Sequence, residues 1–285
     1  MSATATRPSG RKAGLPAGSK APTFVADSID SGWRRAFMTN DLHQIATLLL
    51  ENRGGEGDWG EISRLEGKEC SKKIANKFLI CCLLDWQSNA NVAWQKGENL
   101  VEKLGAPDDV WLTISSFSKQ EWDSKYEEYG KPHRFRKGYE RLWRIANDIC
   151  ARYDGDARNI WLGKTPFEAL VHLWALEAGD QISRMIVGAL RDCGQIQGSS
   201  GDVKADIHLR RVLGRAVDGE EIRAADAAKV TALTRSLNPA DPWQLDWPLW
   251  NVGKSYCRPT SPDCPNCYLR PHCVYSRHHS GAGPR

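Results

Sequence analysis

Apolar residues recur at intervals of three or four along most of the chain, whereas alternation at every second position is nearly absent. Intervals of three or four place apolar side chains on one face of a helix, and alternation is the pattern of strands. The pattern therefore predicts an all-α fold. The helices it predicts lie within 31–52 and over about 72–84, 89–103, 137–153, 166–178, 180–192, 206–216, 220–236 and 241–254.

Turn-forming residues separate several of these helices. Thr165 is placed to cap a helix that begins at Pro166, because its oxygen accepts a backbone N–H and proline tolerates the first turn. The segment 104–136 is polar and mixed, gives no clear element, and has the character of an insertion. Residues 1–24 are rich in Ser, Ala, Gly, Pro and basic residues, which predicts a disordered basic tail.

The charge is concentrated at the two ends of the chain. The 285 residues carry a formal net charge of +4. The first 20 residues contain four basic side chains and no acidic one, and the segment after Asn251 has five basic side chains against Asp263 alone. Basic ends suit a polyanion such as DNA, although a solubilising tail is the more ordinary interpretation of the first segment.

The sequence gives no sign of a membrane partner. No apolar run approaches the about 18 residues that a bilayer-spanning helix needs, and the N-terminus lacks the apolar stretch of a secretory signal. We therefore expect an intracellular protein, and its hydrophobic content of 41% is enough for a substantial core. In a reducing compartment, cysteines outside a metal site are expected to remain thiols.

Four cysteines near the C-terminus form the most specific pattern. Cys257, Cys264, Cys267 and Cys273 make a C-x6-C-x2-C-x5-C run. Closely spaced thiolates in a reducing compartment usually hold a metal centre. Zinc sites favour repeated C-x2-C pairs, and this run has only one. A zinc site and a disulfide-bonded loop are the alternatives to an iron–sulfur cluster.

This cysteine run resembles the [4Fe–4S] loop of endonuclease III. The chain is similar to the helix-hairpin-helix DNA glycosylase superfamily, in its endonuclease III-like iron–sulfur branch, over about 40–276. The specific parts are the cysteine loop within 247–276 and the D-I-H-L-R-R-V motif within 203–214, whereas the helix that leads into the loop is a weak match by itself. Weaker similarity lies in 44–53, 78–87 and 137–153.

The resemblance implies a two-lobed endonuclease III-like fold. Residues 61–199 would form a helical barrel lobe that contains a degenerate helix-hairpin-helix. Residues 25–60 and 200–285 would together form a lobe in which the four cysteines bind a [4Fe–4S] cluster. The implied partner is double-stranded DNA with a damaged or modified base, bound by a monomer in the cytoplasm, in association with the nucleoid.

The resemblance also implies a reaction, the cleavage of the bond between a base and its deoxyribose. The family's essential aspartate falls on Asp206, where a carboxylate would stabilise the oxocarbenium-like sugar or activate water. Plain helix capping is the alternative role for this residue. Gln87 matches the glutamine that fills the gap left by the flipped base, and Asp85 is a candidate to read that base.

Four further residues are candidate contacts to DNA. His208 and Arg211 match family positions and are expected to be structural or to contact phosphate. Lys254 and Arg258 flank Cys257, and Arg258 lies in the six-residue loop that leaves the cluster. Both are expected to contact phosphate.

The hairpin departs from the family pattern. Family members have two glycines that let backbone N–H groups approach a phosphate, and Gly179 alone remains here. Glu177 and Asp180 flank it with negative charge. The Schiff-base lysine of bifunctional members falls on Gln181 or, in a shifted alignment, on Ser183.

The missing lysine separates three possible functions. No lysine occurs over 165–203, so the predicted function is a monofunctional DNA glycosylase that uses water. The first alternative is a non-catalytic iron–sulfur DNA-binding protein of the same fold. The second is a glycosylase with lyase activity from an unusual amine, for which Lys204, two residues before Asp206, is the candidate.

Overall fold

The regular structure is helical, as predicted. The computed structural model describes residues 31–53, 57–65, 67–198 and 201–279, and within these residues there is no strand. The predicted tail over 1–24 lies outside the described residues. None of the described helices is both long and apolar enough to cross a membrane.

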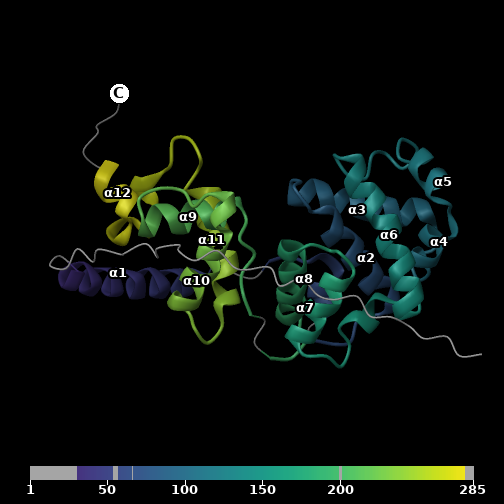
Figure 1. Cartoon of the computed structure of the whole chain (residues 1–285), viewed down its shortest axis with the longest axis horizontal. Coiled ribbons are helices and arrows are strands. Elements are labelled where there is room, and N and C mark those ends of the chain that lie inside the picture. Colours follow the sequence, from purple (N-terminus) through teal and green to yellow (C-terminus); the bar gives the residue numbers. More distant parts are fainter. Residues whose placement is uncertain (1–30, 54–56, 66, 199–200, 280–285) are drawn as a thin grey trace, which may run out of the picture.

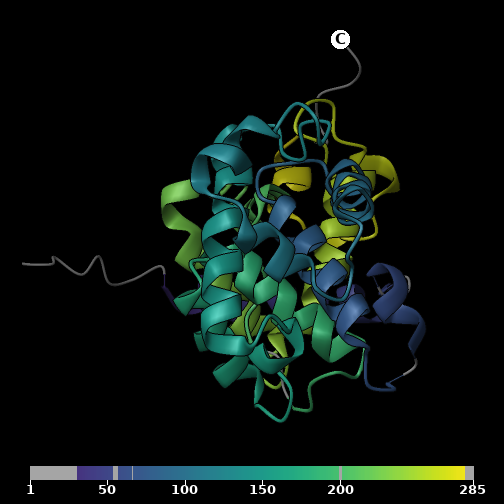
Figure 2. The same ribbon diagram turned by 90° about the vertical axis from the view of Figure 1, so that its right-hand side faces the viewer.

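Two hydrophobic cores organise the molecule, and Figure 1 places them at opposite ends of its long axis. The first core uses buried side chains between Ile62 and Ile196, and we call this part the barrel lobe. The second combines Ile45, Ala46 and Leu49 with buried side chains between Val203 and Leu269, and we call it the cysteine lobe. In Figure 1 the barrel lobe (blue to green) lies on the right and the cysteine lobe (purple first helix, otherwise green to yellow) on the left, and Figure 2 views the molecule from the barrel side.

The barrel lobe contains nine of the helical elements. They are η1 (Gly60–Leu65), α2 (Lys72–Leu84), α3 (Ala90–Leu104), α4 (Val110–Ser116), α5 (Lys119–Ser124), α6 (Arg136–Tyr153), η2 (Ala157–Ile160), α7 (Pro166–Ala175) and α8 (Asp180–Asp192). The run of buried residues from Phe78 to Leu84 makes α2 the central helix. A Cβ atom at Gly97 would lie 2.7 Å from the Sγ atom of Cys81, so glycine lets α3 approach α2 closely.

The segment 104–136 is ordered and belongs to the barrel core. It contributes α4 and α5, whose Trp111 and Trp122 are fully buried. The Trp122 ring stacks on Tyr139 of α6 at a centroid distance of 4.3 Å. Helices of six or seven residues complete fewer than two turns, so their periodicity could not be recognised in the sequence.

The cysteine lobe joins the two ends of the described chain. Its elements are α1 (Ser31–Glu51), α9 (Ile207–Val217), η3 (Ala224–Asp226), α10 (Ala227–Leu237), η4 (Pro242–Leu245), α11 (Asp246–Ser255), η5 (Cys264–Asn266), η6 (Arg270–His272) and α12 (Val274–His279). Helices α9 and α11 pack together where Gly253 lies against His208, since a Cβ atom there would be 2.7 Å from that of His208. The helices predicted at 220 and 241 begin instead with the short turns η3 and η4.

Candidate active site between the two lobes

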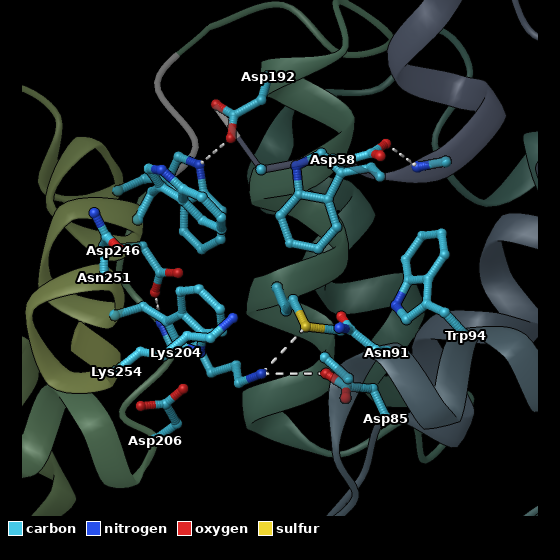
Figure 3. Close-up of a pocket in the computed structure, with 18 of the residues that line it drawn as sticks. Asp58, Asp85, Asn91, Trp94, Asp192, Lys204, Asp206, Asp246, Asn251 and Lys254 are labelled. Carbon is cyan, nitrogen blue, oxygen red and sulfur yellow. Dashed lines mark hydrogen bonds and ion pairs between the residues drawn. The ribbon is translucent and has the colours of Figure 1, made fainter. Parts of the chain in front are cut away.

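A cavity of about 530 Å³ lies between the lobes (Figure 3). The barrel lobe contributes residues before and within η1, the end of α2, the first turns of α3, and α8. The cysteine lobe contributes the segment before α9, η4 and one face of α11. Ligand sites in proteins commonly have this volume and this position between structural units.

Asp206 lies in this cavity and also caps α9. Its Oδ1 atom accepts the backbone N–H groups of His208 at 2.8 Å and Leu209 at 3.0 Å. These bonds use one oxygen of the carboxylate and fix its orientation. Capping and a role in the cavity are therefore compatible, because the second oxygen makes neither of the capping bonds.

Lys204 connects the two lobes inside the cavity. Its Nζ atom lies 3.4 Å from Oδ2 of Asp85 and 3.3 Å from the sulfur of Met185, both in the barrel lobe. Its backbone N–H donates to Oδ1 of Asp246 at 3.1 Å. Burial alone would lower the pKa of Lys204, but the carboxylates of Asp85, Asp206 and Asp246 together raise it. The side chain is therefore an ammonium at neutral pH.

Two carboxyl groups of the site have raised pKa values. Asp85 is 8% exposed, and burial raises its pKa while Lys204 opposes the shift. Burial, and then the neighbouring charge of Asp206, raise the pKa of Asp246 to about 7. Both effects disfavour the charged form of a carboxyl group. Asp246 therefore changes protonation near neutral pH within the cavity.

Tryptophan side chains form much of the cavity wall. Trp59 and Trp94 of the barrel lobe lie 6.3 Å apart, centroid to centroid. Trp247 and Trp250 of α11 are stacked at 5.0 Å, and Trp243 packs against Gly188 of α8. The sequence does not predict that these rings and Asp246 share a site, because they come from separate segments.

Gln87 lies outside the cavity-lining set, in the turn between α2 and α3. It is exposed and has a positive φ of 51°, which turns the chain sharply after the end of α2. The neighbouring Trp86 is held by His133, whose ring stacks on it at 5.5 Å and whose Nε2 atom lies 2.8 Å from the Trp86 carbonyl oxygen. The segment 104–136 therefore braces the turn that presents Gln87.

The hairpin between α7 and α8 is present, with Gly179 at its tip. Gly179 has a φ of 85° and precedes α8 as its N-cap. Glu177 forms an ion pair with Arg144 at 2.8 Å, and Asp180 pairs with Arg184 at 3.0 Å. These pairs partly neutralise the acidic groups that flank the glycine.

The two positions at which the family's Schiff-base lysine falls do not line the cavity. Gln181 is half-buried and bonded to Asp180, Ser183 is fully buried, and neither lines the cavity. That these two positions belong to the DNA-binding surface or the base pocket stays a prediction. Met185, further along α8, is the side chain of this helix that meets Lys204.

Arg211 is buried, 2% exposed, and its donors are used inside the protein. Its Nε atom donates to the carbonyl of Cys257 at 2.5 Å, and Nη2 donates to that of Gly253 at 2.9 Å. His208 lies 3.1 Å from Nη2 and packs under Gly253. Of the two roles predicted for Arg211, the contacts support the structural one and not phosphate binding.

Lys254 and Arg258 are exposed near the start of the cysteine run. Lys254 lines the cavity with its ammonium 4.6 Å from the centroid of Trp250. Arg258 lies outside the cavity-lining set, and its carbonyl accepts a hydrogen bond from Arg215 at 2.8 Å. The two side chains are therefore in different environments, one over the site and one on the loop.

The four cysteines surround one small cavity. Cys257, Cys264, Cys267 and Cys273 line a space of about 30 Å³ and are not joined by disulfides. Arg215 bounds the same space and donates to Sγ of Cys257 at 3.7 Å. No three His, Cys, Asp or Glu side chains in the described part of the chain are arranged to hold a single metal ion. Four thiolates facing a shared space match the donor set of an iron–sulfur cluster.

Comparisons with known proteins bear on the fold. No protein-family model matches the chain, and no curated protein is detectably similar to it in sequence. The chain is similar to the structure of a thermostable thymine-DNA glycosylase, with a TM-score of 0.53 and 14% identity over 86% of this chain and 99% of that one.

Two structures of endonuclease III with DNA give the same result. One is a trapped covalent intermediate in an estranged-adenine complex, and the other is a non-covalent complex. Both have TM-scores of 0.55, with 14% and 15% identity over 88% and 89% of this chain and 100% of theirs. The chain therefore has an endonuclease III-like helix-hairpin-helix fold.

Proposed function

We propose that this chain is a DNA repair glycosylase, which hydrolyses the N-glycosidic bond of a base flipped out of double-stranded DNA. The observation that carries the proposal is the position of Asp206, fixed by its capping bonds in a cavity between the lobes. The fold supports it, because its structural neighbours include a thymine-DNA glycosylase and endonuclease III. The predicted activity is thus favoured over the non-catalytic alternative.

Asp206 would act on the sugar as the bond to the base breaks. Loss of the base leaves positive charge on the deoxyribose, and a carboxylate fixed beside it stabilises that charge or accepts a proton from the attacking water. The capping bonds hold Asp206 in one orientation before the substrate arrives. The enzyme therefore spends little energy on reorganising this group during the reaction.

Hydrolysis by water is the reaction that the cavity supports best. A lysine attacks a sugar only as the neutral amine, and the carboxylates around Lys204 keep it protonated. Lys204 would instead offset their charge as the substrate enters. Because its Nζ atom does lie in the site, lyase activity through Lys204 is the second candidate function.

DNA would contact the surface on which the hairpin and the α2–α3 turn lie. Gln87 would fill the gap left by the flipped base, from a turn that His133 and Trp86 hold in place. Gly179 would let the backbone of the hairpin approach a phosphate at the N-terminus of α8. Lys254 and Arg258 would add phosphate contacts from the cysteine lobe, in a protein that acts as a monomer.

The four C-terminal cysteines would hold a [4Fe–4S] cluster. Their thiolates supply the ligand set, and Arg215 would stabilise it by donating to Cys257. The bound group would contribute to folding of the cysteine lobe, since ligation energy is folding energy. Arg211 links the same segment to α9 through the carbonyl of Cys257.

Asp206→Asn is the decisive variant, because asparagine also caps helices and preserves the bonds to α9. Duplexes with a panel of damaged and modified bases are incubated with protein, and strand breaks are measured with and without hot alkali. We expect breaks only after alkali with the wild-type protein, and none with Asp206→Asn, whose DNA binding should be unchanged.

Each other outcome has a distinct meaning. Equal product from Asp206→Asn contradicts the assigned role. Breaks without alkali, together with a borohydride-trapped adduct that Lys204→Arg abolishes, establish the lyase. DNA binding without product from either protein supports the non-catalytic alternative.

A further inference from the structure

Arg141 lies between the two elements that the proposed function places against DNA. It projects from the second turn of α6, and its side chain is partly buried. Its Nη2 atom donates to the carbonyl oxygen of Leu83 at 2.9 Å, and Nη1 donates to that of Ala178 at 3.5 Å. Leu83 lies in the last turn of α2, four positions before Gln87, and Ala178 immediately precedes Gly179 of the hairpin. One guanidinium therefore bonds to both elements.

The guanidinium also packs against both elements. Its Cζ atom lies 5.3 Å from the centroid of the Trp86 ring, within the range of a cation–π contact. Trp86 is the residue before Gln87. On the hairpin side, a Cβ atom at Gly179 would lie 3.8 Å from Nη1 of Arg141, which is an ordinary contact distance. Arg141 thus contacts the turn after α2 and lies against the tip of the hairpin.

The fold compensates the charge of Arg141 only in part. Burial lowers the pKa of Arg141, the nearby Arg144 lowers it further, and no carboxylate of the described residues opposes the shift. The Nε atom is buried and has no hydrogen-bond partner within the described part of the chain. The two acceptors of Arg141 are carbonyls at or just beyond the C-terminal ends of α2 and α7, which carry partial negative charge. Since desolvating a cation is costly, these bonds explain the arginine better as a means of positioning than as a source of stability.

A neighbouring arginine bonds to one of the two elements alone. Arg152, three turns further along α6, is exposed and donates to the carbonyl oxygen of Ala175 at 3.1 Å. Ala175 is the last residue of α7, so this bond reaches the helix before the hairpin and not α2. Arg152 therefore has the same chemistry as Arg141 on one side, without the bridge.

We infer that Arg141 is a positioning residue that couples the hairpin to the turn that carries Gln87. The inference rests on the proposed function, in which the hairpin contacts a phosphate and Gln87 enters the duplex. With Arg141 in place the two elements keep one spacing, so engagement of the phosphate also brings Gln87 to the gap. By reciprocity, entry of Gln87 strengthens the phosphate contact. Arg141 acts without touching the base or the sugar.

Lysine cannot replace arginine in this role. The guanidinium is planar and presents its N–H groups in a fixed fork, whereas the ammonium of lysine is a single point of charge. Arg141→Lys therefore keeps the positive charge near the hairpin but loses the simultaneous bonds to Leu83 and Ala178. Because small displacements of a positioned group reduce rates by large factors, we expect the variant to fill the gap in DNA roughly tenfold more slowly.

Amide hydrogen exchange without DNA tests the bridge itself. Exchange reports local opening of the backbone, and mass spectrometry measures it in peptides that cover 83–89 and 176–181. Arg141→Lys should speed exchange in both peptides, and Arg152→Lys should leave the first peptide unchanged. Unchanged exchange in either peptide of Arg141→Lys, or faster exchange in the first peptide of Arg152→Lys, overturns the inference.

Gap filling in DNA tests the consequence for function. The probe is a duplex with a tetrahydrofuran abasic analogue opposite 2-aminopurine, whose fluorescence changes when a side chain fills the gap, so no base has to be excised. Stopped-flow fluorescence should show filling at the wild-type rate in Arg152→Lys and roughly tenfold slower filling in Arg141→Lys. Affinity for undamaged duplex, measured by fluorescence anisotropy, should be unchanged in both variants because the charge is kept. Equal slowing in the two variants overturns the inference.

A double-mutant cycle shows whether Arg141 acts through the turn. Gln87→Ala should slow gap filling, and adding Arg141→Lys to it should slow filling little further, since both changes affect the same step. Independent losses that multiply overturn the inference, as does a wild-type signal that does not depend on Gln87. Wild-type gap filling without release of any base from the panel of damaged and modified duplexes contradicts the glycosylase proposal and leaves the inference standing. Should Arg141→Lys fail to fold, Arg141→Gln is measured in the same assays.

Discussion

Three acidic side chains surround Lys204, and its positive charge offsets the repulsion between them. Replacing it by glutamine leaves the carboxylates of Asp85, Asp206 and Asp246 without a nearby cation. We expect Lys204→Gln to lower the free energy of unfolding by about 1–3 kcal/mol, less than for a fully buried pair because a fifth of the lysine side chain is exposed. Urea unfolding measures the change, and Lys204→Arg, which keeps the charge, should lose much less.

Asp246 makes stability depend on pH. Its pKa in the folded protein is raised to about 7, above the 3.8 of an unperturbed aspartic acid. The folded protein therefore keeps this proton when the unfolded chain has lost it, and the contribution of Asp246 to stability declines as the pH rises from about 4 to 7. Because Asp246 is only half-buried and lines the cavity, we expect a loss of about 1–2 kcal/mol rather than the full effect of the shift.

The variant Asp246→Asn tests this pH dependence. Urea unfolding of both proteins between pH 4.5 and 8 should show the variant gaining stability relative to wild type across that window. Glu220→Gln, an exposed site outside the cavity, should show no such trend. Parallel curves for wild type and Asp246→Asn would mean that Asp246 is charged throughout the range.

The site residues that can be predicted from the sequence are those that lie in short motifs. Asp206 and the four cysteines lie in short runs whose spacing is informative. Asp206 lines the cavity between the lobes, and the four cysteines surround a separate small space. Asp246, Trp59, Trp94 and Trp243 lie outside the segments that carry the resemblance, and nothing within 247–276 marks Trp247 and Trp250 as cavity residues. Folding brings them together from segments more than 150 positions apart, as with Trp94 and Trp250, so no pattern in one chain could select them.

The helix-hairpin-helix is the element in which charge opposes DNA binding. Glu177 and Asp180 flank Gly179 at the proposed phosphate contact, and both are exposed. Replacing them together by Gln and Asn should strengthen binding of undamaged duplex DNA severalfold at low salt, and the gain should disappear at high salt. Fluorescence anisotropy measures it. The pair Glu127→Gln and Glu128→Gln, before α6, is the control for total charge.

The turn between α2 and α3 is the element that we expect to enter the duplex. If Gln87 fills the gap, Gln87→Ala should slow base release from duplex DNA about tenfold and have little effect on single-stranded DNA, which needs no gap filled. The variant should fold normally, because Gln87 is exposed and alanine has the same backbone preference at its positive φ. An equal loss on both substrates would place Gln87 in binding rather than in flipping.

Long helices can be predicted from the sequence, whereas the shortest ones cannot. The amphipathic runs over 72–84, 89–103 and 137–153 appear as α2, α3 and α6, because each is long enough to repeat its apolar face. α4 and α5 were not predicted, although Trp111 and Trp122 anchor them in the core. Their assignment depends on tertiary packing, which outweighs local pattern in so short a helix.

At the scale of the whole molecule, the two separate cores predict two unfolding steps. Cys264→Ser removes one proposed cluster ligand, so the cysteine lobe should lose stability while the barrel lobe keeps its core. Thermal unfolding followed by circular dichroism should resolve a lower transition for this variant, with loss of brown colour. Cys150→Ser, in the barrel lobe and outside the cysteine run, is the matched control. A brown Cys264→Ser protein of wild-type stability would contradict the ligand assignment.

The overall arrangement was accessible from the sequence only through the resemblance. Periodicity gave the all-α class, which the structure confirms, but says nothing of how helices are divided between cores. Periodicity also does not indicate that α1 packs against η4, α10, α11 and η6, which lie more than 170 positions further along the chain.

The packing of α1 against segments far along the chain has a consequence for synthesis in the cell. Asp41 of α1 binds His272 at 3.0 Å and Arg277 at 2.8 Å, so the first described helix is completed by residues that are made 231 and 236 positions later. The barrel lobe is one continuous segment and can fold on the ribosome during synthesis. At ordinary rates of translation, the segments that pack against α1 are made roughly 10 to 40 seconds after it. The four cysteines of the run are made after the whole barrel lobe. The proposed cluster would therefore be inserted after the barrel lobe has been made, and a shortage of iron would leave a folded barrel lobe joined to an unfolded cysteine lobe.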